Sequence, residues 1–164
     1  MSGEVAPWLD LLTGALRREH FEAELDRAAR AARRAGESLA LLWVDVDDLS
    51  EHNDVHGRDT LDTTLSWLAA RLSSITGGRG PLGRMDGGAF ALLLPAVSRE
   101  EALRLSARIR RLVPRTLHSS AFGDFRLTVS VGVAVLRPNE PWGNFLEAAE
   151  TACLRAKQGG RDTV

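Results

Sequence analysis

Residues 38–46 are the feature that most constrains the fold of this 164-residue chain. The run Ser-Leu-Ala-Leu-Leu-Trp-Val-Asp-Val is almost continuously apolar, but it is much shorter than the roughly 20 residues of a membrane-spanning helix. A strand with one face in water alternates apolar and polar residues, whereas a strand that is buried on both faces does not. The run therefore predicts a central strand in a sheet that has helices packed against it.

A tight turn is predicted at residues 86–88, where Asp-Gly-Gly separates Leu82 from the apolar residues 90–94. Glycine readily adopts the positive φ that primed hairpin turns need, so this pattern predicts a β-hairpin. Its tip would bring backbone N–H groups close to any ligand above it. No Asp or Glu follows the glycines, so the far side of the tip has no carboxylate that could hold a metal ion.

Four amphipathic helices are predicted at about residues 13–34, 60–75, 98–113 and 141–158. Thr13 is the expected N-cap of the first, and Gly36 ends it. A stripe of leucines marks the second as a core helix. Ser98 begins a capping box with Glu101, and Pro141 suits the first turn of the last helix.

Alternating residues at 125–135 predict a further strand. The middle of the chain then has the order βαββαβ, which is typical of an α+β ferredoxin-like palm. In such a palm, helices cover one face of a central antiparallel sheet. Because no linker interrupts the pattern, we predict one domain over residues 10–164 that follows a lead of residues 1–9.

Composition excludes several classes of protein. The net charge of −1 argues against a dedicated nucleic-acid binder, which is usually basic. We expect neither a membrane segment nor a secretory signal. Cys153 is the only cysteine, which favours a reducing compartment, so we predict a cytoplasmic protein with Cys153 in its core. Lys157 is the only lysine among many arginines.

Six segments resemble, in order and with matching spacing, motifs of the GGDEF family. Any one match is weak evidence, but six in order are strong, and together they cover about residues 10–164. The segments are residues 10–16 (D-x-L-T-G-L), 45–50 (D-I-D-x-F-K), 53–62 (N-D-x-x-G-H-x-x-G-D), 84–90 (R-Y-G-G-D-E-F), 127–134 (the last central strand) and 156–161 (A-K-x-x-G-R).

The resemblance implies a palm of the nucleotide-cyclase type. Active members of the family join two GTP molecules into cyclic di-GMP across a two-fold dimer, so the resemblance also implies a guanine-nucleotide ligand and a homodimer. The reaction is of the phosphoryl-transfer type, and Mg²⁺ organises the triphosphate. Because Mg²⁺ prefers hard oxygen ligands, carboxylates from two strands must converge on it.

The signature of this chain reads Asp86-Gly87-Gly88-Ala89-Phe90. The resemblance implies a second metal carboxylate at the position of Gly88 and a Glu near the reacting hydroxyl at that of Ala89. A shifted register that matches both glycines still leaves Ala89 and Phe90 where carboxylates belong. We therefore predict that no residue of this signature is catalytically competent.

Asp45 matches the metal-binding aspartate of the family, and we expect it to be a vestigial ligand; the less favoured alternative is an Asp that ends a strand or caps a helix. Ser50 stands where the family has a lysine at the triphosphate. The product-inhibition motif R-x-x-D would fall on Gly77 and Gly80, so it is absent.

Four residues match the nucleotide-binding positions of the family. Asn53 and Asp62 match the pair that reads guanine, although a turn Asn and a surface Asp would look the same. Lys157 and Arg161 match residues that contact phosphates, although they also suit an ordinary basic end of a helix. We take all four as candidate nucleotide ligands.

Three functions remain. The first is an inactive GGDEF-type domain that regulates or recruits a protein partner or a neighbouring signalling domain. The second is a sensor that binds GTP weakly, with Mg²⁺ present only if the nucleotide binds. The third is an active cyclase that uses Asp86 together with Asp45, and it is the least favoured because the side chain of Asp86 starts from the other end of the turn.

Overall fold

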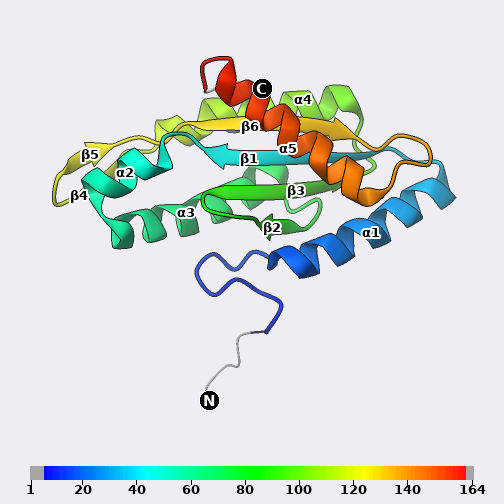
Figure 1. Cartoon of the computed structure of the whole chain (residues 1–164), viewed down its shortest axis with the longest axis horizontal. Coiled ribbons are helices and arrows are strands. Elements are labelled where there is room, and N and C mark those ends of the chain that lie inside the picture. The colour runs from blue at the N-terminus through cyan, green and yellow to red at the C-terminus, as the bar shows by residue number, and fades with distance from the viewer. Residues whose placement is uncertain (1–5, 162–164) are drawn as a thin grey trace.

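Four antiparallel strands form the sheet at the centre of the fold, in the order β2-β3-β1-β6 (Figure 1). The computed structural model describes residues 6–161. The central pair consists of β1 (Leu39–Val46) and β3 (Ala89–Pro95), and the edges are β2 (Leu82–Arg84) and β6 (Val129–Val135). The α+β palm predicted from the sequence is confirmed.

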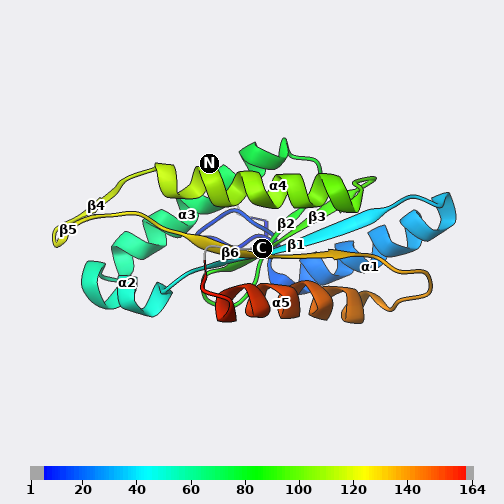
Figure 2. The ribbon, with the colours of Figure 1, turned by 90° about the horizontal axis from the view of Figure 1, so that it is seen from above.

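Helices cover both faces of this sheet (Figure 2). On one face lie α3 (Arg58–Thr76) and α4 (Arg99–Leu112), the two helices of the βαββαβ order. On the other lie α1 (Arg18–Ala35) and α5 (Trp142–Gln158). The two helices of the βαββαβ order thus cover one face, as expected, and the first and last helices of the chain cover the other. This double cover explains why almost every residue of β1 is buried.

The first helix begins later than predicted. Thr13 is not its N-cap, because its backbone N–H and its hydroxyl both donate to the Asp10 carboxylate, at 3.0 and 2.6 Å, within a turn. Instead α1 begins at Arg18, and it ends as expected at Gly36, which has a φ of 65°. Pro141 is also one position off, since it precedes the first residue of α5. The Ser98 cap is confirmed: its Oγ accepts a hydrogen bond from the Glu101 N–H at 3.2 Å.

One helix, one β-hairpin and a short 3₁₀ helix were not predicted from the sequence. The helix α2 (Leu49–His56) has no buried residue. Its sequence therefore needs no apolar stripe, which is the pattern by which an amphipathic helix is recognised. The predicted strand at 125–135 is in fact two strands: Phe125 belongs to a hairpin of β4 (His118–Ser120) and β5 (Gly123–Phe125), and β6 begins only at Val129. A short 3₁₀ helix, η1 (Val113–Arg115), joins α4 to this hairpin and contains Pro114.

No helix within residues 6–161 is long and apolar enough to cross a membrane.

Three of the four histidines of the chain lie together where α2 meets the β4–β5 hairpin. The ring of His56 stacks on that of Phe125 at 4.0 Å, and its Nδ1 lies 2.8 Å from the Ser120 hydroxyl. The ring of His118 meets the ring of Trp67 edge-on at 4.6 Å. This cluster fastens α2 to the hairpin and so positions the helix that carries Asn53.

We predict that the domain loses stability in mild acid. Burial lowers the pKa of His52 and of His118 below the ordinary value of 6.5, and the neighbouring histidines lower both further, while Asp48 and Glu51 oppose the shift at His52. Below that ordinary value the unfolded chain therefore takes up protons more readily than the folded one. The free energy of unfolding, measured in urea, should fall as the pH is lowered from about 7 toward the depressed pKa values.

The matched variants are His118→Gln and His20→Gln, since His20 lies exposed on α1. We expect a shallower pH dependence in the first and an unchanged one in the second. Equal slopes in all three proteins would show that the cluster does not cause the acid sensitivity.

Candidate functional site

The end of β1 carries three aspartates in different settings. The side chain of Asp45 is about one-third exposed, that of Asp47 is buried, and that of Asp48 is about half exposed. Asp48 has a left-handed φ of 53° and immediately precedes α2. The chain thus turns sharply from strand to helix at this point, so the three carboxylates face different surroundings.

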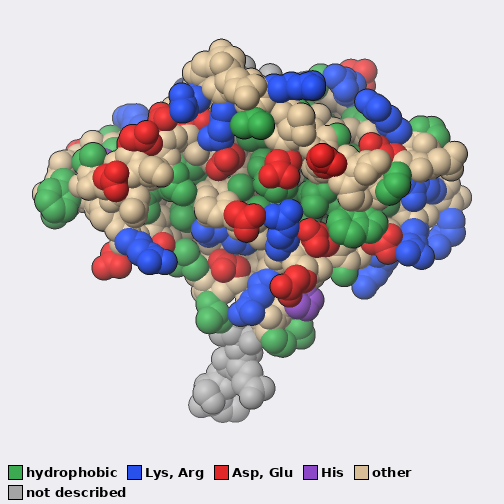
Figure 3. All heavy atoms as spheres, viewed as in Figure 1, with side chains coloured by type: hydrophobic (Ala, Val, Ile, Leu, Met, Phe, Trp, Pro, Cys, Tyr) green, Lys and Arg blue, Asp and Glu red, His purple; other side chains and the backbone are tan. Residues whose placement is uncertain are grey.

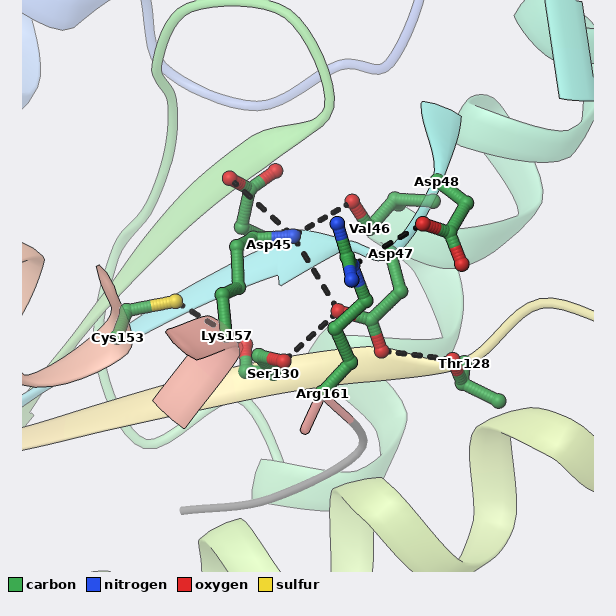
Figure 4. Close-up of polar contacts among 9 residues, drawn as sticks. All are labelled: Asp45, Val46, Asp47, Asp48, Thr128, Ser130, Cys153, Lys157 and Arg161. Carbon is green, nitrogen blue, oxygen red and sulfur yellow. Dashed lines mark hydrogen bonds and ion pairs between the residues drawn. The ribbon is translucent and has the colours of Figure 1, made fainter. Parts of the chain in front are cut away.

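The carboxylate of Asp47 is the most completely bonded of the three (Figure 4). It accepts hydrogen bonds from the hydroxyls of Thr128 and Ser130, at 2.6 and 2.7 Å, and from the ammonium of Lys157 at 3.2 Å. Its backbone N–H donates to the Thr128 carbonyl at 3.0 Å. Asp47 therefore ties the end of β1 to the start of β6 and to α5. No role for Asp47 was predicted from the sequence.

Lys157 reaches into the same site from the last turn of α5. Its Nζ donates to the Val46 carbonyl at 3.0 Å and lies 3.7 Å from Oδ2 of Asp45. Arg161, just beyond the helix, pairs with Asp48 at 3.0 Å. The structure thus brings Asp45, Lys157 and Arg161 together, and in it both cations are already paired with aspartates.

The surroundings of the site shift the pKa values of Asp45 and Cys153. Burial raises the pKa of Asp45, and the charge of Asp47 adds to the rise, while Lys157 opposes it. Burial likewise raises the pKa of the Cys153 thiol to about 12, assisted by the same two aspartates. The Cys153 thiol donates to the Ser130 carbonyl at 3.3 Å, so its assignment to the core is confirmed. A buried thiol with so high a pKa is not a nucleophile.

The signature turn is the predicted hairpin between β2 and β3. Met85 N–H donates to the Ala89 carbonyl at 2.9 Å, and Gly87 adopts a φ of 60°. Ala89 lies directly opposite Asp45 in the β1–β3 register. The Gly88 carbonyl accepts from the Val46 N–H at 3.2 Å. Because position 88 has no side chain and position 89 has only a methyl group, this turn adds no carboxylate to the site.

Asp86 is held on the other side of the turn. Its side chain is 92% exposed and pairs with Arg18 of α1 at 2.9 Å, while Arg18 also binds Glu22 at 3.0 Å. Arg84 lies over the ring of Phe90, 5.2 Å from its centroid. The ion pair thus ties the side chain of Asp86 to α1 rather than to the aspartates at the end of β1, and the Arg84 contact lies within the hairpin itself.

Asn53 and Asp62 lie on consecutive helices. Asn53 is exposed on α2, Asp62 is half-buried in the first turns of α3, and Gly57 separates the two helices. Both helices follow the end of β1 that carries the aspartates (Figure 1). Within residues 6–161, neither side chain makes a hydrogen bond or an ion pair, so their polar groups are available to a ligand.

The family model described as "Diguanylate cyclase, GGDEF domain" matches residues 8–163. The chain belongs to the GGDEF domain family. Among curated relatives, diguanylate cyclase DosC of Escherichia coli is 31% identical over 95% of this chain and 34% of its own length. Response regulator PleD of Caulobacter vibrioides is 30% identical over 94% and 35%. The GGDEF domain thus spans about a third of these relatives.

Solved structures of GGDEF-domain proteins have the same fold as this chain. The GGDEF domain of DgcB from Caulobacter crescentus, in complex with c-di-GMP, superposes with a TM-score of 0.93 at 28% identity and covers 98% of this chain and 95% of that one. Diguanylate cyclase SiaD of Pseudomonas aeruginosa, in complex with its activator SiaC, has a TM-score of 0.90 at 31% identity, over 96% of this chain and 61% of that one.

The residues of this GGDEF domain do not fit a divalent metal ion at Asp45. In the part of the chain that the structure describes, no group of three or more His, Cys, Asp and Glu side chains is arranged to hold one. Gly88 and Ala89 supply no carboxylate from the neighbouring strand, and the ammonium of Lys157 lies among the oxygens of residues 45–47. A metal ion would have to displace this ammonium.

We predict that Asp47→Asn destabilises the domain by about 3 kcal/mol, because the buried ammonium and two hydroxyls lose a charged acceptor. Asp48→Asn is the matched control. It removes a half-exposed ion pair, which contributes about 1 kcal/mol or less, and Asn tolerates the left-handed backbone. Urea unfolding measures both, and equal losses in the two variants would contradict the assigned role of Asp47.

Proposed function

We propose that this GGDEF domain is a catalytically inactive module of cyclic di-GMP signalling. One observation carries the proposal: Gly88 and Ala89 stand opposite the end of β1, where a cyclase needs carboxylates. Mg²⁺ ions stabilise the charge that develops during phosphoryl transfer, and they need oxygen ligands from both strands. The only acidic residue of the turn, Asp86, is engaged with Arg18 instead.

We propose that the domain acts through contact with a protein partner or a neighbouring signalling domain. In the curated relatives, the matching region makes up about a third of the length, so a domain of this kind lies beside further sequence there. A related cyclase, SiaD, has been solved in complex with its activator SiaC. We propose a homodimer on the family resemblance alone.

We propose neither a nucleic-acid partner nor a membrane segment. On the face shown in Figure 3, acidic and basic side chains are interspersed rather than gathered into one basic patch. The net charge of −1 agrees with this distribution. A cytoplasmic location stays a prediction from the single cysteine.

The purified domain should form no measurable cyclic di-GMP from GTP with Mg²⁺ or Mn²⁺. A loss of about 5 kcal/mol of transition-state stabilisation would slow the reaction roughly 10³- to 10⁴-fold. Diguanylate cyclase DosC, assayed in parallel by chromatography, is the positive control. Clear product formation would overturn the proposal, and Asp86→Ala would then test the third function: an active variant would exclude Asp86 as the substitute carboxylate.

A second candidate function is the weak binding of a guanine nucleotide. The observation in its favour is that Asn53 and Asp62 keep uncommitted polar groups that can pair with the edge of guanine. Lys157 and Arg161 would have to exchange their aspartate partners for phosphate oxygens. We therefore propose a dissociation constant of about tens of micromolar or weaker, with Mg²⁺ entering only together with the nucleotide.

Calorimetry with GTP, GDP and cyclic di-GMP tests this second function. We expect a weak binding heat that Asn53→Ala and Asp62→Ala both abolish, because each removes part of the guanine pair. Asp54→Ala, next to Asn53 and also exposed on α2, is the matched control and should bind as the wild type does. The second function is rejected if the wild type gives no heat or if all variants bind equally.

A further inference from the structure

The ammonium of Lys157 is surrounded by oxygens from three consecutive residues. It donates to the Val46 carbonyl at 3.0 Å and to Asp47 Oδ1 at 3.2 Å, and it lies 3.7 Å from Asp45 Oδ2 (Figure 4). A lysine ammonium is a compact charge with three donors, so its geometry suits such a ring of acceptors. One of these oxygens belongs to Asp45, the residue that matches the metal-binding aspartate of the family.

Close packing fixes the position of this ammonium. A Cβ at Gly132 of β6 would lie 2.0 Å from the Ala149 carbonyl oxygen and 2.4 Å from the Cys153 nitrogen. Only glycine therefore allows α5 to approach the sheet so closely. Since Cys153 and Ala156 are also buried, the last turn of α5 is held against the end of β1. The side chain of Lys157 is only 21% exposed as a result.

Charge balance requires a cation at this place. The side chain of Asp47 is 1% exposed and that of Asp45 is 32% exposed, and buried carboxylates are costly unless they are paired. Arg161 is engaged with Asp48. On the adjacent strand β3, Ala89 lies opposite Asp45 and has no charged side chain. Among the described residues, Lys157 is thus the cation that neutralises the pair.

We propose that Lys157 is the built-in cation of this domain and takes the place of a divalent metal ion at the end of β1. The domain is then complete without a metal, and divalent cations add nothing to its stability. Removal of the ammonium leaves the two carboxylates that it contacts without their shared cation, and this pair attracts a divalent cation. The inference goes beyond the proposed function, because it holds whether or not the domain makes cyclic di-GMP.

Thermal unfolding with EDTA and with millimolar Mn²⁺ tests the inference. The wild-type midpoint should be the same in both. Lys157→Met keeps the apolar stem but removes the charge, and we expect its midpoint to fall by about 5 °C or more in EDTA and to recover at least half of that loss in Mn²⁺. If this variant does not fold in EDTA, folding on addition of Mn²⁺ is the supporting result.

Two further variants sharpen the test. Arg155→Met removes an exposed cation from the same helix and should behave as the wild type does. The double variant Asp45→Asn/Lys157→Met lacks one carboxylate and should lose the response to Mn²⁺. A wild type that Mn²⁺ stabilises, or a Lys157→Met protein that ignores Mn²⁺, overturns the inference. Because the readout is unfolding, either result leaves the cyclase assay to decide the proposed function separately.

Discussion

The buried carboxylate of Asp47 is the interaction on which the site depends. Its charge is almost fully removed from water, so it must be neutralised and hydrogen-bonded within the protein. Thr128 and Ser130 provide two hydroxyls from β6, and Lys157 provides the charge from α5. These bonds hold the end of β1 in one position. They therefore also fix the direction in which Asp45 points and the point at which α2 begins.

The packing around the signature turn leaves little room for a carboxylate side chain at Gly88. A Cβ at Gly88 would lie 3.0 Å from Cδ2 of Leu49 and 3.2 Å from Cβ of Val46, so a side chain there requires Leu49 to move. Asp86 is tied to Arg18 on the side of α1. The turn thus forms a hairpin between β2 and β3, and its contacts are those of a structural element. Replacing one residue does not by itself restore both of the carboxylates that positions 88 and 89 lack.

The sequence predicted the parts of the fold that bury apolar side chains in a regular pattern. Residues of β1, the leucine stripe of α3 and the apolar face of α5 were all recognisable in this way. By contrast, α2 has no fully buried residue and the β4–β5 hairpin is short, so neither has a hydrophobic period to detect. Thr13 was misassigned because the same side chain can cap a helix or close a turn, and only the position of Asp10 decides between them.

At the site, too, contacts between residues far apart in the chain could not be predicted from the sequence. These contacts change which residues support nucleotide binding. The sequence placed Lys157 in a phosphate-binding motif, but its nearest acceptor is the Val46 carbonyl, 111 residues away in the chain. Lys157 is thus explained by the ion pair alone, and its presence does not by itself argue for a phosphate ligand. The same holds for Arg161, which is paired with Asp48. Within residues 6–161, the side chains of Asn53 and Asp62 make no hydrogen bond or ion pair, so no side-chain contact in this part of the chain accounts for them. The case for a guanine nucleotide therefore rests on these two residues, and the basic residues bear on affinity rather than on specificity.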